Sequence, residues 1–297
     1  MVQRKIIGHP LGLKKVLIKK TPIVTQRLSL PTEKRKPEGN LGAYTWLIYG
    51  QKKIGKTTLA SLFPDTLFFM FEPGGKALNI YRLDITKWED ALEYLSLLEK
   101  DKKNFKTVVV DTGFEAYQSC MNYVCKKNGI EYPREDNFGK DWAAIKTEFR
   151  SFQNRIMNLG LGFIVLCHEK TKEQSTFTGQ KYDQICPLLS NPADDYYRAV
   201  IDNVCWLHYR GKQRFLQIKG TEYAMAGIAL QANEFFITPK GEQVYAVPIS
   251  NDPKGGYQSI LTAFQNKQEQ TFKMETEEIS KKGVVASIQK KVGGRRR

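Results

Sequence analysis

Eight consecutive residues have the types and spacing of a phosphate-binding loop. They fit the pattern G-x-x-x-x-G-K-[ST] and read Gly50-Gln51-Lys52-Lys53-Ile54-Gly55-Lys56-Thr57, with Thr58 following. Glycines let the backbone wrap so that successive N–H groups face phosphate oxygens, and the next helix adds its positive end. Lys56 would reach the β- and γ-phosphates, and the Thr57 hydroxyl would bind Mg²⁺. The motif predicts a nucleotide site over residues 50–58, with ATP and Mg²⁺ as its ligands.

Two carboxylates end apolar runs that have the character of buried strands. Asp111 closes the run Thr107–Val110, and Glu72 closes the run Thr66–Phe71. A phosphate-binding loop needs an acidic residue at the end of a nearby strand to hold Mg²⁺, and Asp111 is that candidate. Many P-loop motors carry a catalytic Glu directly after this Asp, but this chain has Thr112 there. Glu72 is therefore the candidate base. The alternative role of Asp111 is to cap the next helix, and that of Glu72 is a helix N-cap or a turn acid.

A histidine follows the next apolar run in the same way. His168 comes directly after Phe163–Cys167 and before a long polar stretch. Ligands bind at the carboxyl ends of strands in open α/β sheets, so a polar side chain there can sense the γ-phosphate. The alternative is a surface histidine whose hydrogen bonds are satisfied locally. We expect His168 to belong to the site.

The elements that must position these residues alternate between strands and helices. Apolar runs of strand length are Tyr44–Tyr49, Thr66–Phe71, Thr107–Val110 and Phe163–Cys167, followed by two closely spaced ones near Asn203–Tyr209 and Arg214–Lys219. Helical patterns cover Lys56–Phe63, Lys87–Lys100, the segment up to about Lys127, and Asp141–Asn158. Residues 128–140 and about 169–192 are polar and predict loops. The pattern indicates an α/β fold, with a mostly parallel sheet, helices on both faces and antiparallel additions at one edge.

The net charge of +15 is unevenly placed along the 297 residues. Most of the excess lies in residues 1–36 and 267–297, which predicts two basic arms that reach polyanions or keep the protein in solution. We therefore expect a basic extended arm (1–40), an ATPase core (41–232), strands and a helix that complete the core (233–266), and a tail (267–297). Five cysteines without CxxC spacing argue against a zinc site and favour a reducing compartment. No apolar stretch is long enough to span a bilayer.

Taken together, these motifs resemble the core of RecA-type recombinases. The resemblance rests on the glycine-rich loop, Glu72 after the second strand, Asp111 without a following Glu, and the polar strand tip His168-Glu169-Lys170, and it covers roughly Tyr44 to Gly220. The chain is most similar to phage-encoded RecA-like ATPases of the single-strand annealing or recombinase type. One departure is His168, because RecA itself has a Gln at that position. The resemblance implies a RecA-like P-loop NTPase core.

The same resemblance implies two DNA-binding loops and a residue that acts on a neighbouring subunit. The matching loops are about Asn128–Asp141 and Lys170–Ser190. Cations for phosphates and rings for base stacking suit single strands. The implied DNA-binding residues are Lys126, Lys127, Arg134, Lys140, Lys170, Lys172, Phe177, Lys181 and Tyr182. Mobile loops without a ligand are the alternative. Lys219 is the implied catalytic residue at a neighbour's γ-phosphate, with Arg210 as second choice.

The function implied by the resemblance is an ATP-dependent, single-stranded-DNA-binding recombinase or annealing ATPase. It would act as a homo-oligomer, as a filament or a ring, in the cytoplasm of a bacterial host cell. Single-stranded DNA is the implied partner, and a single-stranded-DNA-binding protein is a further candidate. The alternatives are a helicase-like or helicase-loading ATPase, a nucleotide-gated DNA-binding scaffold with little turnover, and a small-molecule phosphotransferase. The last would need an arginine-rich lid, which the sequence lacks.

Overall fold

The computed structural model describes residues 30–231, 234–252 and 254–272. The chain divides into two compact units, Met1–Lys36 and Pro37–Arg297. Residues 30–36 form no helix or strand, and all the elements below lie in the second unit. Most of the arm 1–40 and of the tail 267–297 falls outside the described residues, so both stay predictions.

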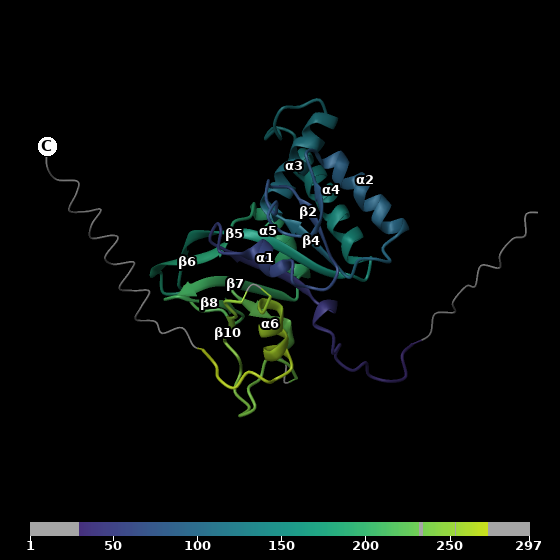
Figure 1. The fold of residues 1–297 in the computed structure, drawn as a ribbon. Helices are drawn as coiled ribbons and strands as arrows, with labels where there is room; N and C mark the ends of the chain where they lie inside the picture. Colours follow the sequence, from purple (N-terminus) through teal and green to yellow (C-terminus); the bar gives the residue numbers. More distant parts are fainter. Residues whose placement is uncertain (1–29, 232–233, 253, 273–297) are drawn as a thin grey trace, which may run out of the picture. The chain divides into compact units, whose positions relative to one another are not determined.

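A ten-stranded sheet forms the centre of the second unit (Figure 1). Across the sheet the strands lie in the order β10 (Ala246–Ile249), β8 (Gln213–Gln217), β7 (Asn203–Arg210), β1 (Thr45–Gly50), β5 (Gly162–Ser175), β4 (Thr107–Asp111), β2 (Thr66–Met70) and β3 (Tyr81–Asp84). From β7 to β3 all neighbours are parallel, whereas β8 and β10 add antiparallel strands at one edge. The expected sheet is confirmed.

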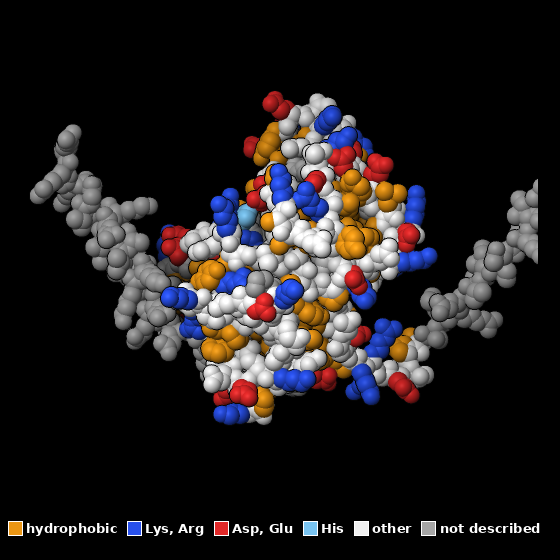
Figure 2. Space-filling view, in the orientation of Figure 1, with side chains coloured by type: hydrophobic (Ala, Val, Ile, Leu, Met, Phe, Trp, Pro, Cys, Tyr) orange, Lys and Arg blue, Asp and Glu red, His pale blue; other side chains and the backbone are white. Residues whose placement is uncertain are grey.

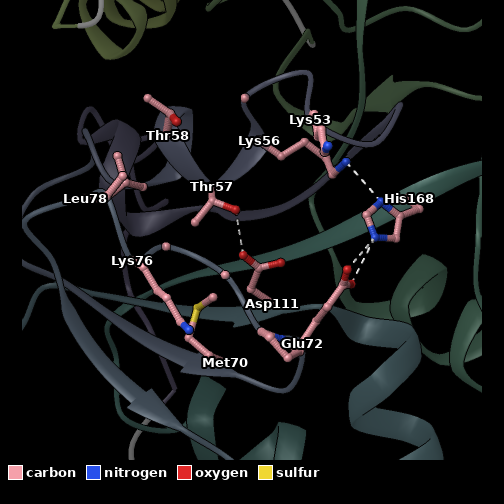
Figure 3. A pocket seen from close by; sticks show the side chains of 15 residues that line it. Lys53, Lys56, Thr57, Thr58, Met70, Glu72, Lys76, Leu78, Asp111 and His168 are labelled. Atoms are coloured by element: carbon pink, nitrogen blue, oxygen red, sulfur yellow. Dashed lines mark hydrogen bonds and ion pairs between the residues drawn. The ribbon is translucent and has the colours of Figure 1, made fainter.

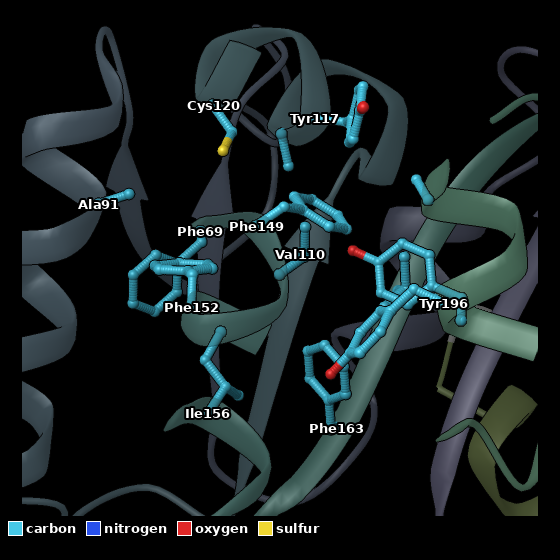
Figure 4. Packing of buried hydrophobic residues seen from close by; sticks show 14 of the residues in the cluster. Phe69, Ala91, Val110, Tyr117, Cys120, Phe149, Phe152, Ile156, Phe163 and Tyr196 are labelled. Atoms are coloured by element: carbon cyan, nitrogen blue, oxygen red, sulfur yellow. The ribbon is translucent and has the colours of Figure 1, made fainter. Parts of the chain in front are cut away.

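Helices cover both faces of this sheet. One face carries α2 (Trp88–Lys100), α3 (Gly113–Lys127), α4 (Lys140–Met157) and α5 (Asn191–Val200), and the other carries α1 (Lys56–Ala60) and α6 (Gly256–Phe264). β1 shows why both are needed: Leu47 and Tyr49 are buried on the first face, and Trp46 and Ile48 on the second. Figure 4 shows rings of β2 and α4 packed together on the first face. Among the described residues no helix is long and apolar enough to cross a membrane.

The polar stretch expected to be a loop over 169–192 is largely a β-hairpin, so that prediction is wrong. β5 continues to Ser175, and β6 (Lys181–Pro187) returns antiparallel along it. The pattern concealed these strands because the outer half of the hairpin is exposed and needs no apolar face. Cross-strand polar pairs join it instead, including Lys181 Nζ with Glu173 Oε1 at 2.7 Å. A short strand β9 (Gly227–Ile228) pairs with β7.

Two other elements differ from the sequence pattern. β3 was missed because it is a short edge strand whose four residues are exposed or half-buried, which leaves no apolar signal. α4 begins at Lys140, one residue before the expected start, and Asp141 lies in its first turn. The Asp141 carboxylate accepts hydrogen bonds from Arg134.

Candidate nucleotide-binding site

The turn between β1 and α1 has the backbone of a phosphate-binding loop. β1 ends at Gly50, and α1 begins at Lys56 with Gly55 as its N-cap at φ 99°. A Cβ at Gly50 would overlap the Leu207 carbonyl oxygen, and one at Gly55 would lie 2.7 Å from Nη1 of Arg214. Both glycines of the motif are therefore required by the geometry, one by close approach and one also by its positive φ.

Lys56 lies under this loop and is almost fully buried. Its ammonium donates to the carbonyl oxygens of Gly50 at 2.9 Å and Gln51 at 2.8 Å, and lies 3.3 Å from Nδ1 of His168. Burial lowers the pKa of Lys56, while the charge of Asp111 opposes that change. The lysine is thus a buried cation at the start of a helix, where an anion is favoured.

Thr57 and Asp111 supply two oxygen ligands of the kind that Mg²⁺ prefers. Thr57 Oγ1 donates to Asp111 Oδ2 at 2.7 Å, although β4 is separated from β1 by β5. Burial raises the pKa of Asp111, and the Thr57 hydrogen bond opposes that rise. Among the described residues no group of three or more His, Cys, Asp or Glu side chains is arranged to hold a metal ion by itself. Thr57 and Asp111 would fit a Mg²⁺ ion, whose further ligands would be phosphate and water.

Glu72 and His168 meet beside this pair (Figure 3). Nε2 of His168 lies 2.9 Å from Oε2 of Glu72, so the imidazole joins Glu72 on one side to Lys56 on the other. The Glu72 backbone N–H donates to the Asp111 carbonyl oxygen at 3.2 Å, which anchors the end of β2 to the end of β4. β2 is not the neighbour of the P-loop strand, but its end faces the same cavity.

These side chains line one cavity of about 670 Å³. The lining residues are Lys53, Gly55, Lys56, Thr57, Thr58, Met70, Glu72, Pro73, Gly74, Gly75, Lys76, Ala77, Leu78, Asp111 and His168. Residues 73–78 form a wall of the cavity that was not predicted, although two glycines after a proline indicate a turn there. Figure 3 places Thr58 and Leu78 at the end of the cavity away from His168. Gln51 and Lys52 are exposed, and Ile54 is buried outside the lining.

The first expected DNA loop, residues 128–140, holds fewer available cations than predicted. The guanidinium of Arg134 makes two hydrogen bonds to Asp141, at 3.0 and 3.3 Å, so Arg134 is committed within the protein. Lys126 and Lys127 lie in the last turn of α3, and Lys140 is the first residue of α4. Two rings of this loop were not predicted as binding residues: Tyr132 and Phe138 are 62% and 96% exposed.

The second expected DNA segment is the β5–β6 hairpin, and its residues divide into two groups. Lys170 donates to the Leu189 carbonyl oxygen at 2.8 Å at the base of the hairpin, which gives it a structural contact. Lys172 and Lys181 are exposed, and Tyr182 is half-buried. Phe177 lies at the tip and is fully exposed. The outer half therefore presents two cations and one ring to solvent.

Lys219 follows the end of β8 that points away from the phosphate-binding loop. Its ammonium donates to Gln243 Oε1 at 2.8 Å and lies 4.4 Å from the centroid of the Tyr245 ring. Leu216 is level with Leu207, and the chain then runs away from the loop, so Lys219 does not line the cavity. Arg210, at the end of β7, lies 5.6 Å from the centroid of the Phe215 ring.

One protein family and two individual proteins are similar to this chain. The AAA domain family AAA_24 matches residues 43–229. The SPbeta prophage-derived uncharacterized protein YorG of Bacillus subtilis is 27% identical over 177 residues, which cover 54% of this chain and 54% of that protein. The chain thus spans about half the length of this relative. A KaiC-like protein from Pyrococcus horikoshii aligns with 72% of this chain and 88% of its own, at 13% identity and a TM-score of 0.39.

The family match extends from the residues before β1 to β9, and so includes all the polar groups of the cavity. Its length is well over half of the 297 residues. The motif at 50–57, the Thr57–Asp111 contact and this match lead to one conclusion. The chain belongs to the AAA domain family and is an α/β P-loop NTPase.

Proposed function

We propose that this protein hydrolyses ATP, with Glu72 as the base that polarises the attacking water. The observation that carries the proposal is that Glu72, His168, Lys56 and Asp111 converge on one cavity from three different strands and the phosphate-binding loop. Lys56 would bind the terminal phosphates, and Thr57 and Asp111 would hold Mg²⁺, which neutralises phosphate charge when bound. Each residue then has a distinct role in phosphoryl transfer.

His168 supports Glu72 in this scheme by holding it in place. The imidazole contacts both the Glu72 carboxylate and the Lys56 ammonium. A movement of Lys56 on phosphate binding would therefore shift His168 and, through it, the Glu72 carboxylate. The residue also lies where β5 leaves the core and becomes the hairpin. We therefore assign His168 the role of a sensor of the bound nucleotide.

We further propose that the ATPase binds single-stranded DNA as a homo-oligomer, in recombination or annealing. Support comes from exposed cations and rings on two segments: Lys172, Phe177 and Lys181 on the hairpin, beside the half-buried Tyr182, and Lys126, Lys127, Tyr132, Phe138 and Lys140 around the 128–140 loop. Rings and cations in this combination suit single strands. Figure 2 shows acidic and basic side chains interspersed on the visible face, so we expect local contacts rather than one broad basic surface.

The oligomer would place Arg210 or Lys219 at a neighbour's phosphates, and Arg210 is the better placed of the two. Arg210 ends β7 just beyond the level of Gly50, whereas Lys219 lies toward the middle of the sheet and contacts Gln243. A single-stranded-DNA-binding protein stays a candidate partner, and the cytoplasm of a bacterial host stays the expected location. The basic arms 1–40 and 267–297 would add to the contacts with DNA.

ATP hydrolysis measured with and without single-stranded DNA tests both proposals. Wild type should release phosphate faster with DNA, Lys56→Ala should lose nucleotide binding, and Glu72→Gln should bind ATP without turnover. A wild-type protein that binds DNA only with ATP but turns over no faster than Glu72→Gln would instead be a nucleotide-gated scaffold. ATP-driven unwinding would favour a helicase-like motor. Absence of DNA binding in ATP would remove the recombinase proposal and leave the ATPase intact.

A further inference from the structure

The outer side of the phosphate-binding loop carries a cation that the functional site does not use. Arg214, near the start of β8, reaches the loop from outside, and the cavity lining does not include it. Its Nη1 lies 3.4 Å from the Ile54 carbonyl oxygen, and its Nη2 lies 3.2 Å from the Ser250 carbonyl oxygen. No carboxylate among the described residues pairs with it. The guanidinium therefore adds an uncompensated positive charge beside the loop.

The contact with Ile54 determines which way one peptide unit of the loop faces. The Ile54–Gly55 peptide is trans, because the chain's described cis bond lies elsewhere. In a trans peptide the C=O and N–H groups point in opposite directions. Since the Ile54 carbonyl points outward to Arg214, the Gly55 N–H points the other way, toward the cavity that Gly55 lines. Within the described part of the chain that N–H has no acceptor.

Arg214 is itself held by the C-terminal part of the domain. Ser250 follows β10, and its backbone N–H donates to Ser259 Oγ on α6 at 3.1 Å. α6 packs closely on α1, since a Cβ at Gly256 would lie 2.8 Å from a methyl carbon of Leu59. The carbonyl that fixes Arg214 thus belongs to a segment braced against the P-loop helix.

We propose that Arg214 is a positioning residue that presents the Gly55 N–H to a phosphate of the bound nucleotide. The inference rests on the proposed nucleotide binding. It implies that β8, β10 and α6 help to hold the phosphate-binding loop in the conformation that binds the nucleotide. Arg214 acts through the Ile54–Gly55 peptide and does not touch the ligand. Because loop N–H groups bind the α- and β-phosphates, ADP and ATP gain equally from this arrangement.

Equilibrium binding of ADP and ATP in Mg²⁺ tests the proposal on the full chain. Arg214→Ala should weaken both nucleotides by about ten- to a hundred-fold, the range of one hydrogen bond to a charged group. Arg214→Lys, which keeps the charge but not the two-armed geometry, should recover part of the loss. Lys212→Ala, in the adjacent turn, is the matched control and should bind as wild type. Arg214→Met keeps the apolar stem, and decides the matter if the Ala variant does not fold.

The possible results separate this proposal from the ATPase proposal. If Arg214→Ala and Arg214→Met bind both nucleotides like Lys212→Ala while Lys56→Ala loses binding, Arg214 has no positioning role and the ATPase stands. A loss confined to ATP would also overturn the proposal, because it would place the effect at the γ-phosphate. Wild-type protein that binds neither nucleotide would overturn both proposals.

Discussion

The nucleotide cavity and the β5–β6 hairpin carry the same kinds of charged residue in opposite surroundings. In the cavity Lys56 and Asp111 are 6% exposed, and burial shifts the pKa of each toward its neutral form. On the hairpin Lys181 and Glu173 form an ion pair whose side chains are 69% and 61% exposed. The first arrangement opposes folding, while an exposed pair contributes at most about 1 kcal/mol. Buried charges at the end of a parallel sheet therefore point to function far more strongly than exposed ones.

The sharpest test of the cavity is Glu72→Gln. We expect kcat for ATP hydrolysis to fall by about 10²- to 10⁴-fold, because the amide cannot accept the proton of the attacking water. ATP affinity should change little, since Lys56 and the loop remain. Steady-state phosphate release measures kcat, and Glu222→Gln, an exposed glutamate, is the control. Equal rates in the two variants would show that another group is the base.

His208 on β7 tests whether burying a titratable side chain outside the cavity also disfavours its charged form. Its ring is 5% exposed and stacks 4.1 Å from that of Trp206, and burial lowers the pKa of His208 to about 4. In the unfolded chain the His208 imidazole takes up a proton near pH 6.5, whereas in the folded protein it does so only near pH 4. The contribution of neutral His208 to the free energy of unfolding is therefore fully present above pH 6.5 and is lost as the pH falls toward 4. The loss is about 3 kcal/mol at its limit.

Chemical denaturation at a series of pH values measures this effect. His208→Phe should keep more of its stability than wild type between pH 6.5 and 4, because it removes the group that titrates. Titration of the carboxyl groups and of the other histidines is common to both proteins and cancels in the difference. Parallel curves for the two proteins would mean that His208 is protonated in the folded state or accessible to solvent.

Phe177→Ala tests the exposed side of the comparison. Stacking of one base on a ring is worth about 1–3 kcal/mol, so we expect single-stranded DNA affinity to fall roughly five- to a hundred-fold. The unfolding midpoint should not move, because the ring is fully exposed. Fluorescence anisotropy with a labelled oligonucleotide at fixed salt measures binding, and Phe177→Trp keeps a stacking surface. If Ala and Trp bind alike, the tip does not stack on bases.

The smallest effect should be a gain in stability from Asp111→Asn. Burial raises the pKa of Asp111, which means that the folded protein holds the protonated carboxyl group more favourably than the carboxylate. The contribution of this group to stability is therefore present below its ordinary pKa and is lost at neutral pH, where it is ionised. Asn keeps an oxygen that can accept from Thr57 without carrying the charge. We expect a higher melting temperature at pH 7 without nucleotide, together with loss of Mg²⁺-dependent hydrolysis. A lower melting temperature would indicate that the carboxylate is stabilised by its neighbours.

Much of the cavity was predictable because its residues end apolar strands. Parallel strands bring their carboxyl ends to one edge of the sheet, so Glu72, Asp111 and His168 could be expected near Lys56 from position alone. The wall at 73–78 and the Arg214 contact with Ile54 could not, because no local pattern reports which loops fold over a cavity. The outer hairpin was missed for a related reason: its strands have no buried face.

The sequence alone determined the phosphate-binding loop, the α/β class and which side chains end each strand, since these depend on residue type and on periods of two and 3.6. Only the tertiary structure decided which partners three cations contact. Arg134 pairs with Asp141, Lys219 donates to Gln243, and Arg214 contacts the Ile54 carbonyl oxygen of the loop. Those contacts join residues whose spacing follows no repeating period, and whether a cation is available to a ligand depends on which partners the fold brings within hydrogen-bonding distance.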